Sequence, residues 1–106
     1  MSFYSVKTLE RKEIARDTLA VFFEKPPGFD FLPGQYFDLK AVNPNFTDPE
    51  GGGRDFSIAS APGEPHLMIV TRLRPTPFKN FLRNAPLGTE MRIKGASGSF
   101  VLGNAT

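Results

Sequence analysis

One short run of the sequence, Arg54-Asp55-Phe56-Ser57, combines side chains that could hold a phosphorylated, ring-containing ligand. On a strand, Arg54 and Phe56 point to one side while Ser57 points to the other. A guanidinium can grip a phosphate through two parallel hydrogen bonds, and an aromatic ring offers a stacking surface. The same run is also what an exposed arginine beside a core phenylalanine looks like, so by itself it leaves both interpretations open.

A second run, which begins at Thr76, predicts a short helix whose N-terminus could attract an anion. Thr76 suits the N-cap and Pro77 suits the first helical position. An apolar helical stripe follows at Phe78, Phe81, Leu82 and Ala85, and Pro86 and Gly88 then end the helix. We interpret the stripe as core packing, and the free N–H groups of the first turn as the feature that could do chemistry.

Six segments with the alternation typical of strands must position these two runs. They are Ser5–Ile14, Asp17–Lys25, Gln35–Val42, Arg54–Ser60, His66–Leu73 and Glu90–Gly95. The sequence therefore predicts an all-β fold, a six-stranded antiparallel Greek-key β-barrel with one short helix between the fifth and sixth strands. A sandwich is the alternative, and we favour a closed barrel because so small an open sheet leaves its edges exposed.

One long loop, Asn43–Gly53, carries three consecutive glycines at its end. Because these glycines precede a strand and not a helix, they do not match a phosphate-binding P-loop. We interpret the loop as a flexible connection, in which Asp48 and Glu50 give no paired-carboxylate signal.

The composition excludes several kinds of site. A chain of 106 residues has room for one domain, which we place at residues 1–106. It has no cysteine and one histidine, so we expect no disulfide, no thiolate nucleophile and no metal site. Thirteen basic and eleven acidic side chains give a net charge of only +2, which argues against a nucleic-acid partner. No apolar run approaches the ~18 residues of a membrane span, and the N-terminus lacks a signal-peptide pattern, so we expect a cytoplasmic protein.

Four motifs in a fixed order resemble those of a known family. They are Pro33-Gly34-Gln35-Tyr36; Arg54-Asp55-Phe56-Ser57 continued by Ile58-Ala59-Ser60-Ala61-Pro62; Thr76-Pro77-Phe78-Lys79 with Leu82; and Leu87-Gly88-Thr89-Glu90 followed by Ile93-Lys94-Gly95 and Gly98-Ser99-Phe100-Val101-Leu102. From Tyr4 to Leu102 the chain resembles the FAD-binding domain of ferredoxin–NADP⁺ reductase-like flavoenzymes, especially bacterial FAD/NAD(P)-dependent oxidoreductases. The resemblance implies FAD as the cofactor.

The resemblance also implies a role for each matching position. Arg54 would pair with the FAD pyrophosphate, Phe56 would lie against the flavin, and Ser57 would hydrogen-bond near flavin N5, as the catalytic position. The backbone of Ile69, Val70, Thr71 and Arg72 would line the flavin edge, and Thr76, Pro77, Phe78 and Lys79 would hold the diphosphate. Pro77 has no N–H, so we expect the amides of Phe78 and Lys79 to be the donors. Two departures are Phe56, where many relatives have tyrosine, and Arg74-Pro75, where many have glycines.

This family places an NAD(P)-binding α/β domain directly after the barrel, and the sequence shows no glycine-rich βαβ pattern for one. We therefore expect an FAD-binding module of an oxidoreductase, which passes electrons between NAD(P)H and an acceptor only when an NAD(P)-binding domain or subunit joins it. Alone it would be incompetent as an enzyme, and a second copy in a homodimer could cover its open flavin face. Two alternatives remain: a flavin-free barrel that acts as an interaction or regulatory module, and a different small barrel that binds nucleic acid or another small ligand.

Overall fold

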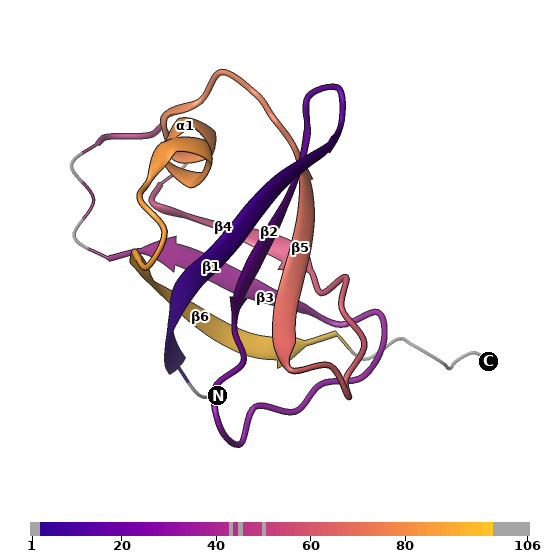
Figure 1. Ribbon diagram of the computed structural model, residues 1–106. Coiled ribbons are helices and arrows are strands. Elements are labelled where there is room, and N and C mark those ends of the chain that lie inside the picture. The colour runs from indigo at the N-terminus through magenta and orange to yellow at the C-terminus, as the bar shows by residue number, and fades with distance from the viewer. Residues whose placement is uncertain (1–2, 43, 45, 50, 99–106) are drawn as a thin grey trace.

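The computed structural model describes residues 3–42, 44, 46–49 and 51–98. Six strands and one helix follow one another along this part of the chain: β1 Phe3–Ala15, β2 Thr18–Glu24, β3 Tyr36–Ala41, β4 Gly53–Ser57, β5 His66–Arg72, α1 Pro77–Asn84 and β6 Glu90–Ser97. Figure 1 shows the strands curling around a common interior, with α1 at one end of the sheet. All six expected strands and the expected helix are confirmed.

β1 and β2 form a long antiparallel hairpin that curls the sheet. A two-residue turn joins them, and its second residue, Asp17, has a φ of 55°. Aspartate tolerates this left-handed conformation better than most side chains do. The pairing register shifts between Thr8 and Glu10 and again between Glu13 and Ala15. Such irregularities increase local twist and bend the strand, which allows β1 to pair with β2 along one part and with β6 along another.

The sheet has the strand order β4-β3-β6-β1-β2-β5. Every paired neighbour is antiparallel. The last strand, β6, lies between β1 and β3, so the chain must return across one end of the sheet to reach it. This return is the long connection of a Greek key, and the connection contains α1. The antiparallel Greek-key architecture with one inserted helix is therefore confirmed.

The expected complete closure of the barrel is corrected by the structure. β4 and β5 are the two edges of the sheet, and no strand ladder joins them within the described residues. The two edges still approach each other. Beyond the end of β4 the Ala59 amide donates to the Met68 carbonyl at 2.8 Å and the Met68 amide donates to Ser60 Oγ at 3.1 Å. β4 ends at Ser57, three residues earlier than expected, because Ser57 pairs with Tyr36, which is the first residue of its partner strand β3.

The core fills the interior of this curled sheet. Its buried apolar residues are Val6, Leu19, Val21, Phe23, Phe29, Phe31, Phe37, Leu39, Phe56, Ile58, Leu67, Ile69, Phe78, Leu82, Met91 and Ile93. The helix contributes Phe78 and Leu82, four residues apart on one face. In the part of the chain that the structure describes, no helix is long and apolar enough to cross a membrane. Burial of Phe78 fixes the N-terminus of α1 next to the beginning of β4.

Candidate functional site: an anion position between β4 and α1

The first turn of α1 is capped as the sequence predicted. Thr76 is extended, and its side-chain oxygen accepts a hydrogen bond from the Lys79 amide at 3.2 Å. The Asn80 amide donates to the Thr76 carbonyl at 2.9 Å, which makes the first backbone bond of the helix. Because Pro77 has no N–H and the Lys79 amide serves the cap, the Phe78 amide is the donor of this turn that faces another segment. Of the two expected backbone donors, Lys79 therefore points to the cap.

Arg54, the second residue of β4, is held in place by the loop that leads into the strand. Its Nη1 donates to the carbonyl oxygens of Gly51 and Gly53 at 2.9 and 2.8 Å. Its Cζ lies 5.0 Å from the centroid of the Phe78 ring, a cation–π distance. The side chain is 17% exposed. These contacts fix the orientation of the guanidinium.

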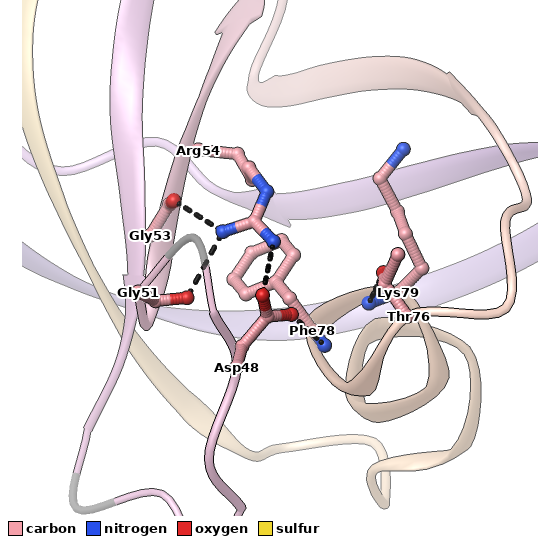
Figure 2. Close-up of polar contacts among 7 residues, drawn as sticks. All are labelled: Asp48, Gly51, Gly53, Arg54, Thr76, Phe78 and Lys79. Carbon is pink, nitrogen blue, oxygen red and sulfur yellow. Dashed lines mark hydrogen bonds and ion pairs between the residues drawn. The ribbon is translucent and has the colours of Figure 1, made fainter.

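Asp48 joins these two elements through one carboxylate. Oδ1 lies 2.9 Å from Arg54 Nη2, and Oδ2 accepts a hydrogen bond from the Phe78 amide at 2.9 Å. Figure 2 shows the carboxylate between the guanidinium and the beginning of the helix. Its side chain is only 2% exposed. A guanidinium and the positive end of a helix thus converge on one buried anion, which is a strong local preference for negative charge.

Lys79 connects the helix to the opposite edge of the sheet. Its Nζ donates to Thr71 Oγ1 at 2.7 Å and to the Arg72 carbonyl at 2.9 Å, both on β5. The same Nζ lies 5.8 Å from the centroid of the Phe56 ring. One cation therefore links β5 and α1 and adds positive charge beside an aromatic surface of β4.

A hollow of about 480 Å³ opens beside these groups. Its lining residues are Arg54, Asp55, Phe56, Arg74, Pro75, Thr76 and Lys79. The ring of Phe56 stacks on that of Phe78 with a centroid distance of 6.2 Å and an interplanar angle of 23°. The hollow thus combines three basic side chains, one carboxylate (Asp55), a hydroxyl and the small exposed part of the Phe56 side chain, which is 9% exposed. This combination suits a ligand that carries both phosphates and a ring.

The structure brings some of the predicted site residues together at this hollow. Arg54, Phe56, Thr76 and Lys79 line it. Phe78 contributes its amide and its stacked ring, Thr71 and Arg72 hold Lys79, and Pro77 begins the helix.

Three other predicted residues lie away from the hollow. Ser57 is exposed on the other face of β4, where it pairs with Tyr36 of β3. Ile69 is fully buried in the core, so its side chain cannot reach a surface ligand, and Val70 is 41% exposed on the outer face of β5. β5 is an edge strand, so its backbone, which is what the resemblance implied, has one side outside the ladders of the described sheet.

Asp48 is the residue that the sequence analysis missed. A weak signal did exist, because the first turn of α1 contains no acidic residue. Helices commonly place a carboxylate there to balance the helix dipole. Here another segment supplies it, from thirty positions earlier in the chain.

Comparisons with known proteins agree with this fold. No family profile matches the chain. Over 60 residues it is 42% identical to the respiratory burst oxidase homolog protein B of Oryza sativa subsp. japonica, a match that covers 55% of this chain and 6% of that protein. Among solved structures, a ferredoxin NADP⁺ reductase from Neisseria gonorrhoeae with bound FAD and NADP superimposes with a TM-score of 0.75 at 20% identity, over 92% of this chain and 39% of the reductase.

A second structure, the ferredoxin reductase in carbazole 1,9a-dioxygenase, superimposes with a TM-score of 0.77 at 20% identity, over 92% of this chain and 29% of that one. The chain thus spans well under half of each of these proteins. The resemblance expected from the sequence is confirmed at the level of the fold: this chain shares the fold of the matched part of both reductases.

Proposed function

We propose that this domain binds FAD and serves as the flavin-binding module of an oxidoreductase. The observation that carries the proposal is the convergence of Arg54 Nη2 and the Phe78 amide on a single buried carboxylate. A carboxylate is the side-chain group that most resembles one end of a phosphate, so Asp48 marks where an anion fits. The solved structure with bound FAD that shares this fold supports the choice of cofactor.

The residues around the hollow suit the parts of such a ligand. Arg54 and the helix N-terminus bind the diphosphate, and the Thr76 hydroxyl can donate a further hydrogen bond. Arg74 and Lys79 supply positive charge at the rim, while Phe56, which is 9% exposed and packs on Phe78, contributes only a small apolar part of the wall. When bound, FAD supplies a redox centre that can exchange electrons with a nicotinamide or with another acceptor.

Ser57 is the residue that we assign to the flavin ring itself. It is exposed beside Tyr36, so a ligand that extends from the hollow across the edge of β4 can meet its hydroxyl. The outer edge of β5 provides the second wall through its backbone. In this arrangement the contacts to the diphosphate anchor the ligand, and the contact with Ser57 adjusts the reduction potential of its flavin ring.

Electron transfer from NAD(P)H requires a site that orients the nicotinamide against the flavin. We assign that task to an NAD(P)-binding domain or subunit, because both superimposed reductases are more than twice as long as the part that this chain matches. The complete oxidoreductase activity therefore belongs to the joined protein.

The test is retention of flavin by the purified protein. After addition of FAD and desalting, we expect the visible absorption of flavin to remain with the protein, and titration by flavin fluorescence should then give the affinity. Arg54→Ala should weaken binding more than tenfold, which corresponds to roughly 1.4 kcal/mol. Arg92→Ala is the matched control, because Arg92 is an exposed arginine on β6 and does not line the hollow. Equal losses in the two variants would mean that only net charge matters, and absence of any bound FAD would leave the flavin-free interaction module as the better interpretation.

A further inference from the structure

We propose that Asp48 is a built-in competitor of the ligand: its carboxylate occupies the anion position in the ligand-free protein and must leave when a diphosphate binds. This inference rests on the proposed function and adds a step to it. The site then has two states, one closed by Asp48 and one open to the ligand.

The first argument is that both claimants use the same two groups. Arg54 and the helix N-terminus are the anion-binding groups assigned to the diphosphate, and Asp48 contacts each of them at 2.9 Å. Each of the two donors faces one oxygen of the carboxylate, as it would face one oxygen of a bound phosphate. Asp48 and the diphosphate therefore compete directly for the same two hydrogen-bond donors.

The second argument is steric and electrostatic. With 2% of its side chain exposed, Asp48 takes the position between Arg54 Nη2 and the Phe78 amide, where a second anion would have to lie in order to contact both groups. A diphosphate that approached with Asp48 in place would also meet a like charge at close range in a poorly screened site. Coexistence of the two anions is thus disfavoured twice.

The third argument is that Asp48 can leave without disturbing the sheet. It lies in the connection between β3 and β4, in a turn closed by a hydrogen bond of 2.8 Å from the Gly51 amide to the Asp48 carbonyl. Gly51 has a φ of 92°, and a Cβ placed there would meet nothing within 4 Å. The chain therefore borders open space at Gly51, and Asp48 belongs to no strand, so a change of its side-chain rotamer breaks no strand ladder.

Competition of this kind lowers the apparent affinity by the fraction of molecules in the open state. If the closed state predominates by about ten to one, removing the Asp48 charge raises the apparent affinity for FAD about tenfold. The same change lowers the stability of the protein without ligand, because Arg54 loses its buried carboxylate partner. Affinity and stability should therefore move in opposite directions.

The experiment compares wild type, Asp48→Asn and Asp30→Asn by thermal unfolding without ligand and by titration with FAD and with riboflavin. Asp30 is a matched control, since it is an exposed aspartate in the connection between β2 and β3 and does not line the hollow. We expect Asp48→Asn to lower the Tm, to bind FAD at least fivefold more tightly and to leave riboflavin binding unchanged, because riboflavin carries no phosphate. Asp30→Asn should change FAD affinity less than twofold.

The outcomes separate this inference from the proposed function. If wild type binds FAD and Asp48→Asn binds it equally or less tightly, Asp48 is a positioning residue and the competitor is excluded, while FAD binding stands. If no variant binds FAD, both fail. Should Asp48→Asn not fold, the Phe78 backbone amide resonance of the wild-type protein decides: saturation with FAD must shift it strongly and riboflavin must not, whereas an unmoved resonance overturns the inference.

Discussion

The two edge strands of the sheet are built on different principles. β5 alternates regularly, with Leu67, Ile69 and Thr71 buried and the residues between them facing outward. β4 is shorter, and its second residue is a charged side chain held between a loop, a helix and an aromatic ring. Apolar burial therefore dominates on β5, whereas the beginning of β4 adds an ion pair to its ladder with β3.

This difference matters for function because the two kinds of contact respond differently to a ligand. Apolar burial is not altered by an anion, whereas an ion pair can exchange its carboxylate for a phosphate. The β4 edge can thus bind and release an anion, while the β5 edge keeps its conformation. Variants on the two edges should separate these roles, and we consider them in order of their expected effect on the free energy of unfolding.

Ile69→Ala should have the largest effect. Ile69 is completely buried on β5, and loss of its side chain leaves a cavity that costs about 3–5 kcal/mol. Urea unfolding measures the change, with Val70→Ala as the control because Val70 is 41% exposed on the same strand. A loss below about 1 kcal/mol for Ile69→Ala would contradict the claim that burial fixes this edge.

Arg54→Met should come next, at about 2–3 kcal/mol, because it leaves the buried Asp48 carboxylate without its guanidinium partner. The estimate lies below that for a fully buried pair since Arg54 is 17% exposed. The informative measurement is a double-mutant cycle with Asp48→Asn in the absence of ligand. We expect the double variant to be less destabilised than the sum of the single variants by about 1–2 kcal/mol, and simple additivity would show that the pair is not coupled.

Lys79→Met tests the link between the two edges. The substitution keeps an apolar stem but removes the ammonium that donates to Thr71 Oγ1 and to the Arg72 carbonyl. Loss of these charge-assisted bonds should cost about 1–2 kcal/mol and increase amide hydrogen exchange in the first turn of α1. Lys12→Met, at an exposed position of β1, is the control and should leave both quantities unchanged.

How well the sequence predicted each region follows from how local its physics is. The helix begins at Pro77 after a Thr76 cap, as expected, because both preferences act within one turn. The strands are found for a similar reason, since alternation is written in consecutive residues. The early end of β4 at Ser57 was missed because pairing depends on partners elsewhere in the sheet.

The residues of the candidate site also differ in whether local sequence or tertiary packing determines their role. Arg54, Phe56 and the helix start at Thr76 were predicted to form a site from their residue types and from the family resemblance, and all three line one hollow. Asp48 was not found, because its role exists only after two elements far apart in the sequence have packed together. A lone aspartate in a glycine-rich loop has no periodicity and no fixed spacing that would identify it.

Ser57→Ala should have the smallest effect on stability. It should also distinguish the role of the diphosphate contacts, which set the affinity, from that of the contact with the flavin ring, which sets the reduction potential. Ser57 is exposed, so the free energy of unfolding should change by less than about 0.5 kcal/mol. FAD affinity should stay within about twofold, because the diphosphate contacts supply most of the charge-assisted bonding. The reduction potential of the bound flavin should shift by about 10–30 mV, since a hydrogen bond near the ring favours one oxidation state over the other. Ser5→Ala, an exposed serine on β1, should leave that potential unchanged. Equal potentials in wild type and Ser57→Ala would move the flavin ring away from this face of β4 and confine the site to the hollow beside α1.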